Sequence, residues 1–346
     1  MELVCAALYV GSARFGRLRL DNNYVTEYTV STYNTLRRKI SNMAHVTICT
    51  ASDSNYFGML TGLLDSLADG ETCKDWPVSI LDVGLTPEQA EALKTRGATV
   101  IEAGWDVDFP GRETMPGYYR AMSARPYLPK YFPGHEIYLW IDADAWVQKS
   151  SYLENYVRGA ERGKIACVPE MDRGYWTMYR RPKMWAQNQK AFAWGFGLRA
   201  GDKLGRNPVV GAGMFAIKGD APHWKLWADA HRKILNRPRF KKPGIGNFYT
   251  FLSEQTALNY MIFADKAPST FLPAYTHWVC GKGDLLFDKD RKWLVEPHEP
   301  HEVIGVVHPG GQAMKERLWE IPTLEGDSVK AQLTYREFMD FRNALP

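Results

Sequence analysis

Apolar and polar positions alternate along residues 45–142 in the order expected of an α/β protein. β-rich runs, which we predict to be strands, occupy residues 45–51, 78–83 and 99–102. Between them, residues 57–67 carry leucines at helical spacing, and Thr86-Pro87-Glu88-Gln89 has the composition of a helix start with a capping box. Because strands and helices alternate, we predict right-handed crossovers and a mostly parallel central sheet flanked by helices.

The most informative stretch is an apolar run followed at once by two acids. Residues 137–141 are apolar throughout, as in a strand buried on both faces, and Asp142-Ala143-Asp144 comes directly after them. Two carboxylates at the end of a buried strand are costly to hold together unless something neutralises them. A hard divalent cation does so and also binds the oxygens of a diphosphate. The motif alone is equally compatible with a polar turn after a core strand.

The segment before this strand carries two arginines. Residues 118–132 have a helical pattern that Pro126 and Pro129 interrupt. Arg120 and Arg125 lie in it, and the planar fork of an arginine suits a phosphate. A surface salt bridge is the commoner role for such residues, and the spacing alone favours that interpretation.

The second half of the chain continues the α/β pattern and adds a long aromatic-rich segment. Residues 170–208 are either an acceptor-binding flap or an insertion with its own small core. Gly211 and Gly213 interrupt a predicted strand, which indicates a bulge or the close approach of a ligand. Further strands are expected at residues 164–169, 209–218 and 303–307, the last of the chain, and helices at 151–162, 222–237, 253–264 and 334–345. Capping boxes are expected at Ser151 and Thr334.

A histidine ends the last predicted strand. His308 is a candidate third metal ligand if that strand ends beside Asp142 and Asp144. A lone histidine is more often a hydrogen-bonded polar residue, so this assignment depends on what else converges there.

Composition narrows the functional classes. A net charge of +4 is too small to indicate nucleic-acid binding, and neither a Walker A sequence nor a dinucleotide fingerprint is present. The five cysteines have no paired spacing, which is typical of reduced thiols in a cytoplasmic protein. No apolar run reaches the length of a membrane span. The basic cluster at residues 231–242 can contact anionic lipid at a membrane surface, although a solvated face is the commoner role.

In order and spacing, these pieces resemble a known family over residues 45–319. The chain is similar to the retaining GT-A glycosyltransferases that include glycogenin and the bacterial lipopolysaccharide galactosyltransferases. The residues that carry the resemblance are Ala51-Ser52-Asp53-Ser54-Asn55-Tyr56, Ala124-Arg125, Asp142-Ala143-Asp144, Gly211-Ala212-Gly213, Glu254-Gln255 with Leu258-Asn259, Leu272-Pro273 with His277, and His308 with Gly311. The resemblance implies a single GT-A domain and transfer of a sugar from a nucleotide diphosphate sugar, a UDP-sugar, to a glycan or other hydroxyl acceptor.

The resemblance also implies roles for individual residues. Tyr56 would stack on uracil, Asp53 and Asn55 would hold the base and ribose, and Arg125 would contact the donor. Asp142, Asp144 and His308 would hold Mn²⁺ or Mg²⁺. Ala51, Ala143, Gly211, Ala212, Gly311 and Lys315 complete the expected donor-binding set.

The catalytic residues implied by the resemblance are Gln255, Glu254 and Arg125. Gln255 would lie at the reacting face, and Glu254 would orient the donor sugar. The chain departs from the family pattern where Gly211 replaces an Asn, Glu254 replaces an Asp, and Lys315 stands one residue later than the expected lysine. These departures are compatible with nucleotide binding and put the identity of the sugar in question.

Three divisions of the chain follow. Residues 1–43 are an N-terminal extension, or Met43 is the natural start; residues 44–323 are the transferase domain; and residues 324–346 are a C-terminal helical tail. Two other functions stay open. One is a phosphatase of the haloacid dehalogenase type, whose motif wants Thr or Val where Trp146 stands. The other is a sugar-binding or inactive relative, which predicts no metal-dependent turnover.

Overall fold

The computed structural model describes residues 46–346 except 177–179, 181, 238–245, 311–313 and 315. The predicted extension at residues 1–43 therefore lies outside the described residues. The chain from His45 to Pro346 forms one compact unit, which includes the predicted C-terminal tail.

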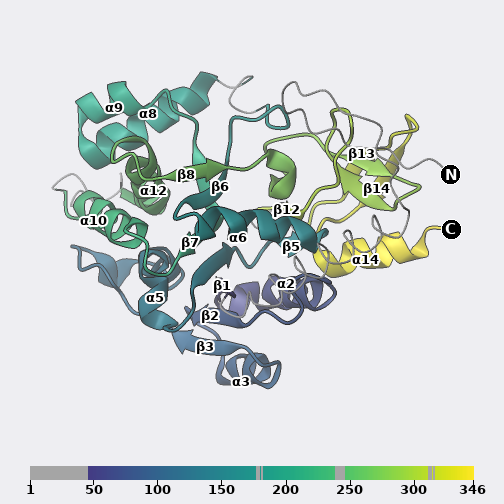
Figure 1. Ribbon diagram of the computed structural model, residues 1–346, viewed down its shortest axis with the longest axis horizontal. Helices are drawn as coiled ribbons and strands as arrows, with labels where there is room; N and C mark the ends of the chain where they lie inside the picture. The colour runs from purple at the N-terminus through teal and green to yellow at the C-terminus, as the bar shows by residue number, and fades with distance from the viewer. Residues whose placement is uncertain (1–45, 177–179, 181, 238–245, 311–313, 315) are drawn as a thin grey trace, which may run out of the picture. The chain divides into compact units, whose positions relative to one another are not determined.

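The core of this unit is a seven-stranded sheet with the order β3-β2-β1-β4-β7-β6-β8 (Figure 1). Every neighbouring pair is parallel except the two that involve β7, which runs antiparallel to β4 and to β6. The predicted mostly parallel α/β sheet is thus confirmed. The strands are β1 (Val46–Ser52), β2 (Val78–Asp82), β3 (Thr99–Glu102), β4 (Ile137–Ile141), β6 (Ile165–Pro169), β7 (Val210–Lys218) and β8 (Ser269–Phe271).

Helices cover both faces of the sheet. On one face, Tyr138 and Trp140 of β4 share a buried core with Phe215 of β7 and with side chains of α10 and α12. On the other, α6 packs against β4, β6 and β7 (Figure 1). This two-sided cover explains why β4 is apolar at every position. Helices of this unit include α2 (Phe57–Ala68), α3 (Pro87–Thr95), α6 (Leu153–Glu161), α10 (His223–Leu235), α11 (Gly246–Phe251), α12 (Ser253–Phe263) and α14 (Tyr335–Ala344).

The helix starts and the helix break predicted from the sequence are only partly confirmed. The capping box at Thr86 is present as predicted. The predicted interruption by prolines is also confirmed, because residues 119–131 divide into α4 (Tyr119–Ala124), a short 3₁₀ turn (Arg125–Tyr127) and α5 (Leu128–Tyr131). The capping box at Ser151 was wrong: Ser151 lies within a 3₁₀ turn, and α6 begins after Tyr152 without a side-chain cap among the described residues. Thr334 does precede α14, but its hydroxyl bonds the Glu337 carboxylate instead of a backbone N–H.

The aromatic-rich segment at residues 170–208 contains two helices, α8 (Pro182–Phe196) and α9 (Leu198–Leu204). The two pack against each other, and α8 also packs on α10 and α12 (Figure 1). Phe192 is buried, and the ring of Phe196 stacks on Tyr260 of α12 with centroids 3.7 Å apart. The described part of the insertion is therefore a packed layer that shares the main core.

The prediction that residues 303–307 form the last strand was wrong. The strand there is β12 (Val306–His308), and it belongs to a second, three-stranded sheet with β5 (Trp146–Val147) and β9 (Trp278–Val279). One hairpin, of β10 (Leu286–Asp288) and β11 (Trp293–Val295), precedes β12 in the chain. A second hairpin, of β13 (Trp319–Pro322) and β14 (Ser328–Ala331), follows β12. The C-terminal tail thus contains a strand as well as α14, which packs beside α2 (Figure 1). None of the helices in the described ranges is long and apolar enough to cross a membrane.

Candidate functional site

A cavity of about 490 Å³ opens where several strands end. The carboxyl ends of β1 and β4 form its floor, the end of β12 closes one side, and residues of α4 and the start of α12 form the wall. Ligands of open α/β sheets bind at this edge, where loops leave parallel strands. The volume lies within the range of small-molecule sites.

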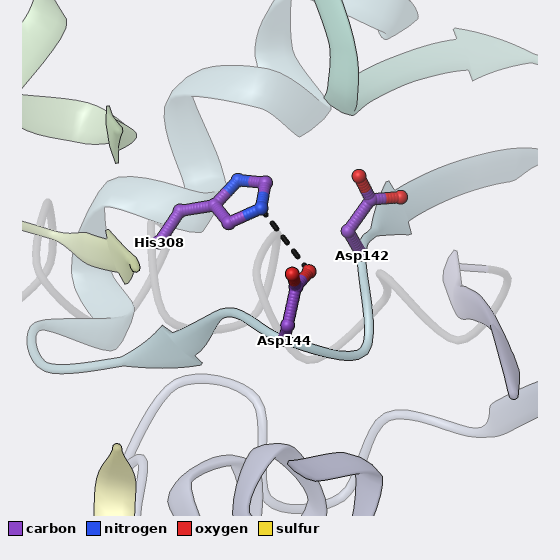
Figure 2. Close-up of side chains that lie close together, drawn as sticks. All are labelled: Asp142, Asp144 and His308. Carbon is purple, nitrogen blue, oxygen red and sulfur yellow. Dashed lines mark ion pairs between the residues drawn. The ribbon is translucent and has the colours of Figure 1, made fainter. Parts of the chain in front are cut away.

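Two acids and one histidine converge in this cavity, as the sequence predicted. Asp142, Asp144 and His308 each offer one ligand atom, and these atoms lie within 4.8 Å of one another (Figure 2). Nε2 of His308 is 3.1 Å from Oδ1 of Asp144. The turn that presents the two acids is held by the N–H of Ala145, which donates to the Asp142 carbonyl over 3.0 Å. β12 pairs with β5, which follows the acids directly, and this pairing brings His308 to them.

Gly213 leaves the space between these ligands open. A Cβ atom built there would lie 2.9 Å from Cε1 of His308 and 3.0 Å from Oδ2 of Asp142. The register of β7 against β6 shifts in this region, between the Cys167–Phe215 and Pro169–Val210 pairs. Of the two alternatives predicted from the glycines, the bulge is therefore present. Two carboxylate oxygens, one imidazole nitrogen and a glycine-sized gap fit a small divalent cation such as Mn²⁺ or Mg²⁺.

The charged groups of this cluster shift one another's pKa values. Burial raises the pKa of Asp142, while Arg125 and His308 oppose that rise. Burial alone would lower the pKa of His308, but the carboxylates of Asp144 and Asp142 outweigh it and raise that pKa above its ordinary value. In the absence of a cation, a protonated His308 can therefore balance part of the negative charge.

Arg125 spans two carboxylates in the cavity wall. Its guanidinium donates to Oδ1 of Asp142 over 2.6 Å and to Oε2 of Glu254 over 3.2 Å. It also lies over the indole of Trp140, 4.5 Å from the ring centroid. Arg125 is thus held by two acids, and only 12% of its side chain is exposed.

Trp140 is a site residue that the sequence reasoning missed. Its indole N–H donates to Oδ1 of Asp142 over 2.7 Å, and Arg125 donates to the same oxygen. The other carboxylate oxygen, Oδ2, stays on the side of Gly213 and His308. The sequence did contain the necessary information, because residues two apart on a strand share a face and Asp142 follows Trp140 by two positions. Trp140 was nevertheless interpreted only as part of the apolar run.

The first turn of α12 brings two further predicted residues to the cavity. Gln255 lines it directly, and Glu254 is 1% exposed. Oε1 of Glu254 has no hydrogen-bond partner among the described residues. Burial raises the pKa of Glu254 to about 7, and the nearby Arg125 limits the rise. The structure therefore places Arg125, Glu254 and Gln255 together beside the acid pair.

The predicted nucleotide loop is only partly in the cavity. Ala51, Asp53 and Tyr56 line it, and Oδ1 of Asp53 caps the following turn by accepting the N–H groups of Asn55 and Tyr56, each over 3.0 Å. Asn55 lines a separate cavity between α2 and α14 instead. Two exposed aromatics that the sequence reasoning missed, Tyr118 and Phe251, also line the main cavity.

The remaining predicted donor contacts divide into three groups. Ala143 and Ala212 line the cavity. Gly211 is not among the described residues that line it, and a Cβ there would come no closer to another group than 3.9 Å, at Glu170. Gly311 and Lys315 lie outside the described residues.

The described part of the basic cluster is engaged with the protein itself. His231 is buried, Arg232 pairs with Asp229 over 2.8 Å, and Arg237 donates to the carbonyl of Gly195 over 3.1 Å. Residues 238–242 of the cluster lie outside the described residues.

Comparison with known proteins gives similarity at the level of structure. No protein-family model and no curated protein matches the sequence. The chain aligns with the galactosyltransferase LgtC solved with donor and acceptor sugar analogues, at 13% identity and a TM-score of 0.48, over 86% of this chain and 96% of that one. It aligns with the bifunctional glycosyltransferase WbbM at 12% identity and a TM-score of 0.47, over 88% and 50%. A third alignment, with mouse xyloside xylosyltransferase 1, has 12% identity and a TM-score of 0.43, over 78% and 98%. At these values the alignments carry no argument, and the functional proposal rests on the site.

Proposed function

We propose that the chain is a metal-dependent GT-A glycosyltransferase that moves a sugar from a UDP-sugar to an acceptor hydroxyl with retention. The convergence of Asp142, Asp144 and His308 at the floor of the cavity is the observation that carries this proposal. The motif resemblance supports the nucleotide, the hexosyl class and the stereochemistry, and it adds Arg125, Glu254 and Gln255, which lie in the same cavity.

The three ligands have distinct tasks in this proposal. Asp142 and Asp144 would hold the cation through carboxylate oxygens, and His308 would hold it through Nε2. A divalent cation held by these residues would supply positive charge that stabilises a leaving diphosphate. Gly213 keeps the space between the ligands free of any side chain.

The donor would lie along the cavity from Tyr56 to Gln255. Tyr56 offers an aromatic ring in the 3₁₀ turn after β1 for stacking on the base. Arg125 pairs with both the Asp142 and the Glu254 carboxylates, and its single positive charge offsets part of their negative charge beside a diphosphate. Glu254 would accept from a hydroxyl of the donor sugar through its unpaired Oε1.

Gln255 is our choice for the residue nearest the reacting carbon. Its amide is neutral, so it can steady a developing positive centre through its oxygen without acting as a base. The acceptor would be a glycan or other hydroxyl compound reached from the cytoplasm, and contact with a membrane surface through residues 231–242 is part of the same proposal.

The test is slow donor hydrolysis. UDP- and GDP-sugars would be incubated with the protein and Mn²⁺, with EDTA, and with the Asp144→Ala variant. We expect release of one nucleotide that EDTA and Asp144→Ala both abolish. Asp220→Ala is the matched control, because that carboxylate is 74% exposed and pairs with Lys218 at the surface. Release that is unchanged by EDTA, or no release and no binding of UDP with Mn²⁺, would overturn the proposal.

A further inference from the structure

A second histidine stands behind the candidate metal ligand. We propose that His277 is a positioning residue that fixes which ring nitrogen of His308 faces the cation. This inference rests on the proposed function, since it concerns the same metal site. Nothing in the sequence pattern assigned His277 a role beyond its place after Leu272-Pro273.

The second sheet places the two rings against each other. β9 and β12 are parallel, with Val279 opposite His308, and the N–H of Cys280 donates to the His308 carbonyl over 3.0 Å. His277 immediately precedes β9. Nε2 of His277 lies 3.0 Å from Nδ1 of His308, and the ring centroids are 5.2 Å apart at an interplanar angle of 29°. His277 is 5% exposed, so water does not compete freely for this bond.

The contact with His277 restricts which ring nitrogen of His308 carries the proton. A neutral imidazole carries its proton on one nitrogen and a lone pair on the other. For Nε2 of His308 to give its lone pair to a cation, the proton must stay on Nδ1. Nδ1–H then donates to Nε2 of His277. His277 thus stabilises the tautomer that can bind metal and fixes the rotation of the His308 ring.

His277 is itself firmly held. The hydroxyl of Tyr175 donates to the His277 carbonyl, and the N–H of Val279 donates to the same hydroxyl over 3.0 Å. The N–H of His277 donates to the carbonyl of Ala274 over 3.0 Å. Tyr175 is 1% exposed, so the start of β9 is anchored in the core. An acceptor that is fixed in this way can orient a neighbouring ring, whereas a mobile one could not.

Two substitutions separate positioning from packing. His277→Phe keeps an aromatic ring against His308 but removes the acceptor. His277→Gln places an amide where Nε2 stood and so keeps an acceptor for Nδ1–H. Binding of Mn²⁺ to the full chain would be measured by the loss of the free-ion electron paramagnetic resonance signal, with and without UDP. Thermal melting in EDTA would be recorded for each variant.

We expect His277→Phe to weaken Mn²⁺ binding about 10- to 100-fold, as outer-shell substitutions at metal sites do. His277→Gln should restore most of the affinity. Equal affinity of the wild type and His277→Phe would overturn the positioning role, as would a glutamine variant that melts like the wild type but binds as poorly as the phenylalanine variant.

The wild-type protein supplies a further readout if a variant does not fold. With Mg²⁺ bound, long-range ¹H–¹⁵N spectra should show the proton of His308 on Nδ1, and a proton on Nε2 would contradict the proposal. Failure of the proposed function would look different. In that case the wild type binds Mn²⁺ with the His277 dependence intact but hydrolyses no sugar nucleotide, whereas a wild type that binds no Mn²⁺ would overturn both proposals.

Discussion

Glu254 allows a quantitative test of the buried charge network. The substitution Glu254→Gln removes a titrating group but keeps an oxygen that can accept from Arg125. Burial raises the pKa of Glu254 from 4.5 to about 7 in the folded protein. Below pH 4.5 the carboxyl is protonated in both the folded and unfolded states, and its full contribution to stability is present. As the pH rises from there through about 7, the unfolded state gains by ionising first, and that stability is lost.

The magnitude follows from the shift. At 1.36 kcal/mol per pKa unit, the free energy of unfolding of the wild type should fall by about 3 kcal/mol across this window because of Glu254 alone. Glu254→Gln should lack this fall. Urea unfolding in EDTA at pH 5, 6, 7 and 8 would measure it, and the stability of the variant relative to the wild type should rise from pH 5 to about pH 7 and level off above that.

The control for this experiment is a glutamate of the same type at the surface. Glu325 lies exposed in the turn between β13 and β14, so Glu325→Gln makes the same chemical change without burial. Its stability relative to the wild type, measured at the same pH values, is the baseline for the Glu254→Gln series. A Glu254→Gln difference that follows the control at every pH would contradict the account in which burial outweighs the charge of Arg125 and raises the pKa of Glu254 to about 7.

Three further substitutions test the geometry of the site. Trp140→Phe keeps an aromatic ring beneath Arg125 but removes the N–H that donates to Asp142. We expect about tenfold weaker Mn²⁺ binding in a titration followed by electron paramagnetic resonance. Gly213→Ala would place a Cβ 2.9 Å from the ligand histidine and abolish Mn²⁺ binding, whereas Gly211→Ala, with nothing nearer than 3.9 Å, should bind normally. Tyr56→Ala should weaken UDP binding by calorimetry more than Asn55→Ala does, because Tyr56 lines the main cavity; equal losses would contradict the placement.

Elements that depend on local pattern were predictable from the sequence. The apolar run of β4 and the strand β3 have the predicted bounds, because burial on both faces and β-rich composition are written into consecutive residues. The break of the helix before β4 follows from Pro126 and Pro129, whose rings do not fit a continuous helix.

Features that depend on distant partners were not predictable in the same way. β12 was misplaced because its partner strands lie at Trp146 and Trp278, far from it in the chain, and no local pattern encodes that pairing. Trp140 is a different case, because Asp142 lies only two residues away; the contact was missed since Trp140 was taken only as part of the apolar run. Asn55 matched a motif, yet the turn that Asp53 caps directs it to another cavity.

The site itself was largely predictable because its parts lie at strand ends. Asp142, Asp144 and His308 were chosen for their chemistry and position, and the structure brings their ligand atoms within 4.8 Å. The contact of His308 with His277 could not be predicted, since it depends on the register of two short strands in a second sheet.

The most direct test of the account is the position of Mn²⁺ in a crystal grown with UDP. Anomalous scattering from manganese would locate the ion without reference to any homologous structure. We predict a single strong peak among Asp142, Asp144 and His308, with the UDP diphosphate bound to the same ion and the base beside Tyr56. UDP bound in the cavity without that peak, or a peak at other residues, would contradict the claim that this cluster holds the metal for sugar transfer.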